Sequence, residues 1–239
     1  MHITTKAIVL SSIRYKDADL IVRCYTEKFG VKSYLLKSVL KSKKGKIKAG
    51  YFQPLSILDI EANHNDNRDL QYIKEVKLGY NLSTLQTNIV KSTIAIFLSE
   101  ILTNILREEE ENIKLFEFLK TSIIWSDENQ PYPLFHHVFL LELTKYLGFY
   151  PDLSKKEKLY FDLLEGEFKD TKSGNYTVFG ENLTLLKQLL GIKFDVNKTP
   201  KMNSTQKQEI LNMILLYFEL HLDGFKKPRS LVVLNQVFS

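Results

Sequence analysis

The residues whose type and spacing point most clearly to chemistry are the lysines of one short segment. Residues 36–51, LKSVLKSKKGKIKAGY, contain no acidic residue and carry Lys37, Lys41, Lys43, Lys44, Lys46 and Lys48. Crowded ammonium groups repel one another, and a phosphate backbone relieves this repulsion because its neutralisation releases counterions. An isolated run of lysines is usually only solvated charge. Because this run lies in a segment that is itself basic, we interpret it as the binding site of a polyanion.

Aromatic residues flank the lysine-rich segment. Tyr34, Tyr51 and Phe52 place rings within reach of the charges, and ring faces can stack on bases. Each of these residues is more simply interpreted as a member of a hydrophobic core.

Other basic residues could extend the surface. Arg14 and Lys16 fall in a turn, and Arg23 falls on an outward position of a strand. The predicted binding set is therefore Arg14, Arg23, Lys37, Lys41, Lys43, Lys44, Lys46 and Lys48. A second, smaller basic feature, residues 226–229, precedes the apolar run 231–234.

The charge of the chain is unevenly distributed. The net charge is +5, yet residues 1–80 carry 15 Lys and Arg against 8 Asp and Glu. The remaining residues carry 18 against 20, so the positive excess is confined to the first third. Such asymmetry indicates a polyanion partner for that third.

Motifs of common enzymes are absent from the sequence. It has no Gly-rich phosphate loop, no His-Glu-x-x-His, no Gly-x-Ser-x-Gly and no spaced carboxylates of the kind that hold magnesium. The acidic run 108–111 is interpreted as a solvated loop or helix start. His136 and His137 are adjacent, so they face apart on a helix. We predict no catalytic residue, no cofactor and no metal site, since a metal site would require the convergence of distant residues.

Cysteine content and hydropathy favour a reducing cytosol. Cys24 is the single cysteine, which excludes an intramolecular disulfide and a thiolate-rich metal site within one chain. The first twenty residues show no signal peptide. The apolar region 93–106 contains Ser99, Glu100, Thr103 and Asn104 and is too polar for a membrane span.

The elements that must position the basic residues are short strands. Leu20, Val22 and Cys24 alternate with Arg23 and Tyr25, which is the pattern of a strand with one buried face. Similar runs separated by turn residues cover 3–11, 19–26, 29–40, 55–62 and 70–78. Five such strands are typical of a small closed or sandwich β domain.

The period changes to that of helices from Asn81. Helical patterns cover 81–106, 112–125 and 133–147, the last stopping at Gly148. Thr205 and Gln208 have the spacing of a capping box for a further helix that ends at Gly224. Between these helices, residues 158–179 indicate a small β excursion with a turn at 172–175. We therefore predict an α+β protein with a β domain at 1–80 and a mainly helical domain at 81–239.

An ordered series of segments resembles the bacterial recombination mediator family RecO. The series comprises TEKFG (26–30), FQPL (52–55), LQYIKE (70–75), FLLEL (139–143), LGFYPDL (147–153), residues 217–222 and KKPRS (226–230). No single segment is specific, and the resemblance rests on their order over most of the chain.

The resemblance implies a fold and an activity. It implies an OB-fold barrel of five strands followed by a helical domain. It also implies binding of single- and double-stranded DNA, annealing of complementary strands, and loading of recombinase onto strands coated by single-strand-binding protein. The implied partners are RecR and the acidic C-terminal tail of that coating protein. The hydropathy of the chain predicts no membrane partner. The lysine-rich segment and Arg23 would contact phosphates and contribute affinity rather than sequence readout.

The chain departs from the family pattern in one place. Many members carry a four-cysteine zinc site after the Leu-Gly-x-x-Pro segment, but residues 152–180 contain neither cysteine nor histidine. We expect the excursion to be held by its own packing, with candidate residues Tyr160, Phe161, Leu163, Leu164, Phe168, Tyr176 and Phe179.

Two other functions compete with a repair mediator. The same basic barrel is compatible with an RNA- or ribosome-binding protein, which would prefer structured RNA. An enzyme with dispersed ligands, such as a nuclease, would show magnesium-dependent cleavage.

Overall fold

The computed structural model describes residues 1–238 except 42–46, 66, 108–109, 193 and 195–199. The chain divides into two compact units. The first comprises residues 1–131 and 228–234, and the second comprises 132–227 and 235–239. Lys43, Lys44 and Lys46 of the predicted binding set lie outside the described residues.

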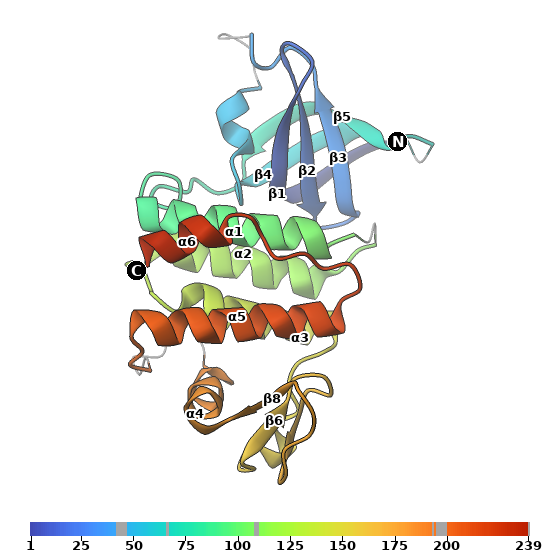
Figure 1. The fold of residues 1–239 in the computed structure, drawn as a ribbon. Coiled ribbons are helices and arrows are strands. Elements are labelled where there is room, and N and C mark those ends of the chain that lie inside the picture. Colours follow the sequence, from blue (N-terminus) through green and yellow to red (C-terminus); the bar gives the residue numbers. More distant parts are fainter. Residues whose placement is uncertain (42–46, 66, 108–109, 193, 195–199, 239) are drawn as a thin grey trace. The chain divides into compact units, whose positions relative to one another are not determined.

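The first unit begins with a closed barrel (Figure 1). Its strands are β1 (His2–Tyr15), β2 (Asp19–Thr26), β3 (Gly30–Leu36), β4 (Ile57–Asn63) and β5 (Leu70–Leu78). They are joined in the order β1-β2-β3-β5-β4, and pairing of β1 with β4 closes the barrel. The pairing of β3 with β5 is parallel, and every other pairing of the barrel is antiparallel. This is the OB-fold arrangement, so the predicted barrel is confirmed.

The barrel core follows the alternation read from the sequence. Leu20, Val22 and Cys24 of β2 and Tyr34 and Leu36 of β3 point inside and are at most 7% exposed. Burial raises the pKa of the Cys24 thiol, so this residue acts as a small apolar side chain rather than a nucleophile.

The helices α1 (Ile89–Ile105) and α2 (Ile113–Glu128) complete most of the first unit. The prediction that helix starts at Asn81 is wrong. The carboxylate of Asp127 accepts the backbone amides of Ser83, Thr84 and Leu85, and these bonds hold the linker outside a helix. The structure starts α1 after Asn88, whose side chain caps it.

The second unit contains α3 (Phe135–Leu147), α4 (Gly180–Leu189) and α5 (Ser204–His221). As predicted, α3 stops at Gly148, which adopts a left-handed φ of 84°. The predicted capping box of α5, Thr205 with Gln208, is wrong by two residues. Asn203 and Gln206 form it, because each side chain accepts the other's backbone amide.

The predicted β excursion is a three-stranded antiparallel sheet in the second unit. It consists of β6 (Tyr160–Asp162), β7 (Glu167–Lys169) and β8 (Thr177–Phe179), in the order β7-β6-β8. Short 3-10 helices η1 (Ala49–Phe52) and η2 (Leu153–Lys155) and the C-terminal helix α6 (Leu231–Val237) complete the described elements. The predicted α+β class is therefore confirmed. None of the helices in the described part of the chain is long and apolar enough to span a bilayer.

Candidate nucleic-acid interface

One end of the barrel is built from the β1–β2 hairpin and the segment that follows β3. The backbone amide of Ser38 donates to the Asp19 carboxylate over 2.7 Å. The amide of Leu40 donates to the carbonyl of Ala18 over 3.0 Å. These bonds hold the start of the lysine-rich segment beside the hairpin turn.

This geometry gathers basic side chains from two separate parts of the sequence. Arg14, Lys16, Lys37 and Lys41 lie at this end and are exposed, and we call them the basic barrel end. Arg14 donates to the carbonyl of Asp17 over 2.9 Å. Among the described residues, none of the four forms an ion pair with a carboxylate. Such ammonium and guanidinium groups can neutralise phosphates without first breaking an internal pair.

Lys48 continues the lysine-rich segment on the other side of the undescribed residues. It is exposed and precedes η1. Phe52, at the end of η1, lies in the barrel core and is 2% exposed. Both ends of the lysine-rich segment are thus anchored to the barrel.

Arg23 lies in a different environment from the other predicted residues. Its side chain points out of the barrel, as predicted, but α1 covers that part of the wall. Its guanidinium donates to the carbonyls of Thr103 and Leu106 over 3.1 and 2.8 Å. Burial and the nearby Arg107 lower the pKa of Arg23. The DNA contact predicted for Arg23 is not tested by this geometry. Because two carbonyls already accept its hydrogen bonds, we expect this guanidinium to act structurally at the end of α1.

The aromatics that flank the lysine-rich segment are core residues. Tyr34 is fully buried, and its hydroxyl lies 3.0 Å from the Nε2 of His64. Phe52 is buried, and Tyr51 packs partly buried against the same core. The simpler of the two interpretations of these residues is confirmed.

Two other tyrosines are exposed at the same end of the barrel. Tyr15 is 39% and Tyr72 is 37% exposed. The ammonium of Lys16 lies 5.2 Å from the Tyr15 ring centre, and that of Lys37 lies 5.5 Å from the Tyr72 ring centre. Neither tyrosine is among the residues predicted from the sequence to contact a polyanion. Side chains alternate along a strand, so the inward direction of Gln71 in β5 places the next side chain, Tyr72, on the outer face.

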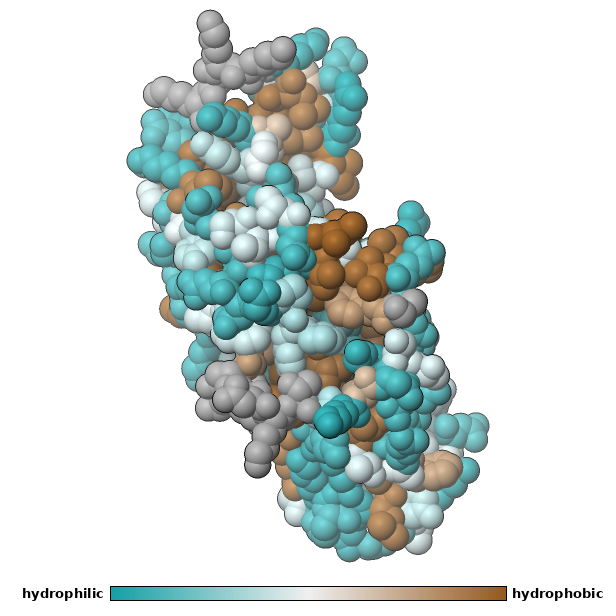
Figure 2. Space-filling view, turned by 90° about the vertical axis from the view of Figure 1, so that its left-hand side faces the viewer, coloured by the Kyte–Doolittle hydropathy of each residue, from teal (hydrophilic) through white to brown (hydrophobic). Residues whose placement is uncertain are grey.

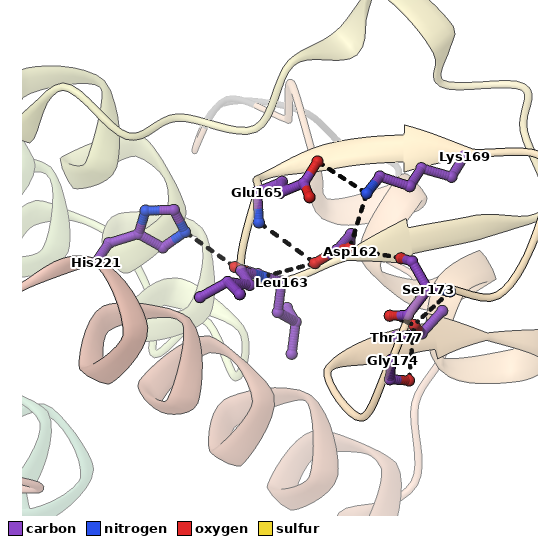
Figure 3. Close-up of polar contacts among 9 residues, drawn as sticks. Asp162, Leu163, Glu165, Lys169, Ser173, Gly174, Thr177 and His221 are labelled. Atoms are coloured by element: carbon purple, nitrogen blue, oxygen red, sulfur yellow. Dashed lines mark hydrogen bonds and ion pairs between the residues drawn. The ribbon is translucent and has the colours of Figure 1, made fainter.

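The small sheet of the second unit does not fit a zinc site of the family type. Its centre is the carboxylate of Asp162, which is 5% exposed (Figure 3). This carboxylate accepts hydrogen bonds from Lys169, Ser173 and the amides of Leu164 and Glu165. Burial alone would raise the pKa of Asp162, but these bonds outweigh it and lower the pKa to about 2. Among the described residues, no group of three or more His, Cys, Asp or Glu side chains could hold a metal ion.

The apolar packing of this sheet agrees only in part with the prediction. Phe161, Leu163 and Phe168 are buried, and the rings of Phe161 and Phe168 lie 4.8 Å apart. In contrast, Leu164, Tyr176 and Phe179 are 42–54% exposed, so these three candidates are not part of the buried core of the sheet. The hydrogen bonds to the buried Asp162 carboxylate therefore hold the sheet together alongside the buried apolar residues.

The second unit also has an apolar groove with lysines at its rim. Its volume is about 490 Å³, and it is lined by Pro133, Leu134, Pro200, Lys201, Met202, Asn203 and Lys207. The imidazole of His137 is buried nearby and lies 2.9 Å from the carbonyl of Lys207. An apolar groove of this kind suits an apolar side chain that carries a negative charge beside it.

The comparisons with known proteins agree with this architecture. The family model Recombination protein O N terminal matches residues 1–81, and Recombination protein O C terminal matches residues 86–230. The DNA repair protein RecO of Christiangramia forsetii is 47% identical over 238 residues, which cover both chains in full. The RecO proteins of Flavobacterium psychrophilum and Bacteroides fragilis are 45% and 36% identical, covering 100% and 98% of both chains. The chain therefore belongs to the RecO family of DNA repair proteins.

Proposed function

We propose that the chain binds single- and double-stranded DNA through the basic barrel end and the lysine-rich segment. The observation that carries this proposal is the gathering of Arg14, Lys16, Lys37 and Lys41 at one end of an OB-fold barrel without ion pairs among the described residues. OB-fold barrels bind strands with their loops and one strand face. Lysine contacts to phosphates supply affinity that is independent of base sequence.

The same contacts support a role in annealing. Two complementary strands repel each other through their phosphates, and a protein that neutralises part of this charge lets them approach. Because the contacts read no base, the bases stay available for pairing with the second strand. The proposed role is therefore non-catalytic, and it makes and breaks no covalent bond. A protein with this role acts in the cytoplasm at the nucleoid.

The direct test is the binding of a fluorescent single-stranded oligonucleotide across a series of salt concentrations. The test variant replaces Lys41, Lys43, Lys44 and Lys46 by Ala. The control variant replaces the exposed lysines Lys114, Lys155, Lys172 and Lys226 by Ala, which removes the same charge elsewhere. We expect only the test variant to bind more weakly, with a log–log salt slope that shrinks by roughly 0.7 per lost contact. Equal effects of the two variants would mean that net charge alone drives binding.

Annealing separates this proposal from its competitors. We expect the protein to accelerate pairing of complementary oligonucleotides without ATP, and the test variant to lose this acceleration. A marked preference for structured RNA would favour the ribosome-associated alternative. Magnesium-dependent cleavage of labelled DNA would overturn the non-catalytic role.

We further propose that the chain helps to load recombinase onto strands coated by single-strand-binding protein, together with RecR. The acidic C-terminal tail of the coating protein would bind the groove around Leu134 and Met202, with Lys201 and Lys207 facing its carboxylates. Lys145 of α3 is a less suitable cation for binding the acidic tail, since its ammonium already pairs with Glu142 over 2.6 Å. A tail peptide should lose affinity for Lys201→Glu/Lys207→Glu and keep it for the control Lys155→Glu/Lys172→Glu. Unchanged affinity for both variants would place the tail elsewhere.

A further inference from the structure

The outward face of the barrel end carries a row of apolar side chains across four strands. Ile13 of β1 pairs with Ile21 of β2, and Ile21 pairs with Leu35 of β3. The parallel pairing of Tyr34 with Gln71 places the next residues, Leu35 and Tyr72, beside each other. We call Ile13, Ile21, Leu35 and Tyr72 the outer row.

The outer row points away from the core. The neighbours Leu20, Leu36 and Tyr34 point inward, and side chains alternate along a strand. Ile13 is 63% and Tyr72 is 37% exposed. Figure 2 shows the left-hand side of Figure 1, where a further apolar area lies among hydrophilic side chains at the upper end of the barrel; β3 and β5 lie on the other side. Further along β2, Arg23 donates hydrogen bonds to the end of α1, and Tyr25 contacts Asn112 and Phe116 at the start of α2. Among the described residues, no hydrogen bond or ring contact joins the outer row to a helix in this way.

Tyr15 extends this face toward the hairpin turn. It lies two residues beyond Ile13, so its ring emerges on the same side of β1. Each exposed tyrosine has a lysine ammonium near its ring, Lys16 at Tyr15 and Lys37 at Tyr72. Asp17 and Asp19 are also at this end, but the Asp19 carboxylate already accepts the amide of Ser38.

An exposed apolar face with ring-associated cations matches the chemistry of an unpaired nucleotide. An unpaired base offers a flat apolar face, and its phosphate offers the negative charge. A base pair inside a duplex offers no free face, since its neighbours stack on both sides. The lysine stems are flexible, so an ammonium can move from a ring to a phosphate when a base arrives.

We propose that Tyr15 and Tyr72 stack on unpaired bases and thereby make the barrel end prefer single strands over duplex. Lys16 and Lys37 then contact the phosphates on either side of the stacked bases. This inference rests on the proposed function, because it assigns a selective role to rings within the same DNA-binding surface. Ile13, Ile21 and Leu35 of the outer row supply the apolar surface between the two rings.

The test compares three ligands of equal length: a single strand, a single strand of abasic sites, and a duplex. The test variants are Tyr15→Ala, Tyr72→Ala and their combination. Tyr176→Ala is the control, because this tyrosine is 42% exposed in the second unit. Each test substitution should weaken binding of the single strand by about fivefold or more, and leave the abasic strand and the duplex unchanged. Tyr72→Trp, which keeps a ring, should retain binding of the single strand.

Three outcomes decide the matter. Equal weakening for all three ligands would overturn the inference, because the rings would then only support the fold or the lysines. No weakening for any ligand would overturn it as well. Lys16→Gln/Lys37→Gln serves as the reference, since it should weaken all three ligands. If the reference and the lysine-rich test variant both leave duplex and abasic binding intact, the proposed DNA-binding surface itself fails, independently of the rings.

Discussion

The guanidinium of Arg23, on β2 of the barrel, donates a hydrogen bond of 2.8 Å to the carbonyl of Leu106, at the C-terminal end of α1. The last carbonyls of a helix have no partner within the helix and carry a partial negative charge. Arg23 satisfies two of them, because it also donates to Thr103 over 3.1 Å. This contact joins the barrel to α1 within the first unit. It covers β2 at Arg23, whereas Ile21 of the same strand belongs to the exposed outer row.

We predict that Arg23→Ala destabilises the first unit without weakening phosphate contacts. Loss of two charge-assisted hydrogen bonds should lower the free energy of unfolding by about 1.5–3 kcal/mol. Trp125 is the only tryptophan of the chain and lies in α2, so its fluorescence during urea unfolding reports this unit. The salt slope of DNA binding should stay unchanged.

Arg14→Ala is the matched control for Arg23→Ala. Arg14 is exposed and its bond to Asp17 stays within the hairpin turn, so stability should change little. Its salt slope for a single strand should shrink by roughly 0.7, as expected for one lost phosphate. The reverse pattern, in which Arg23 changes the slope and Arg14 changes stability, would contradict this assignment.

The carboxylate of Asp162 should be the main polar determinant of the small sheet. Asp162→Asn replaces an acceptor of Lys169 and Ser173 by an amide group in a buried site. We expect the free energy of unfolding to fall by about 1–3 kcal/mol, measured by far-ultraviolet circular dichroism and by hydrogen exchange in β6 and β7. Asp170→Asn is the control, since Asp170 is 73% exposed in its pair with Lys158 and should contribute under about 1 kcal/mol.

Acid should abolish the difference between the wild type and Asp162→Asn. The folded-state pKa of Asp162 is about 2, below its ordinary value of 3.8. The stabilisation is therefore present above pH 3.8 and is lost as the pH falls toward 2. Unfolding curves at neutral pH and near pH 2 would show this convergence, and a constant difference between the two proteins would contradict it.

His137 should make the second unit sensitive to mild acid. Burial lowers the pKa of His137 to about 4 from 6.5, so below pH 6.5 the unfolded chain binds a proton that the folded chain refuses. Stability is then complete above pH 6.5 and falls as the pH drops toward 4. Between pH 7 and pH 5 the loss from this group is about 2 kcal/mol.

His137→Phe tests this pH dependence because it keeps a buried ring and removes the titration. The variant loses the contact with the carbonyl of Lys207 and should be less stable at pH 7. Its further loss between pH 7 and pH 5 should be smaller than that of the wild type by about 2 kcal/mol. His2→Gln, which removes a half-exposed histidine, is the control variant. Identical profiles of all three proteins would rule out His137 as the source.

The sequence predicted the features that depend on periodicity within one element. Leu20, Val22 and Cys24 alternate because one face of β2 is core, and this alternation survives in any fold that buries that face. Gly148 ends α3 because its left-handed φ favours glycine. Such features need no knowledge of distant residues.

Features that depend on distant partners could not be read in this way. The outward direction of the Arg23 side chain was predicted, but the carbonyls that accept its hydrogen bonds lie some 80 residues later in the chain. The linker before α1 is held by Asp127, which no local pattern connects to Ser83. The exposure of the Tyr15 and Tyr72 rings at one end of the barrel depends on the register of the strands, which no local pattern gives.

The C-terminal helix α6 should depend on one carboxylate of α1. Glu100 accepts the backbone amides of Arg229 and Ser230 over 2.8 and 3.0 Å, and the Ser230 hydroxyl over 2.6 Å. A carboxylate at a helix N-terminus satisfies donors that have no partner within the helix. Glu100→Ala leaves these donors without their acceptor, and α6 should detach from α1 more often.

Limited trypsin digestion measures this detachment, since the cleavable bond after Arg229 lies immediately before α6. Cleavage of a transiently opened segment follows its open population, and loss of the charge-assisted bonds should raise that population about tenfold. Glu117→Ala, which removes a partly buried pair with Lys120 in α2, should leave the cleavage rate at this site unchanged. Equal cleavage rates in Glu100→Ala and the wild type would mean that apolar packing, such as that of the buried Leu234, holds α6 without the carboxylate.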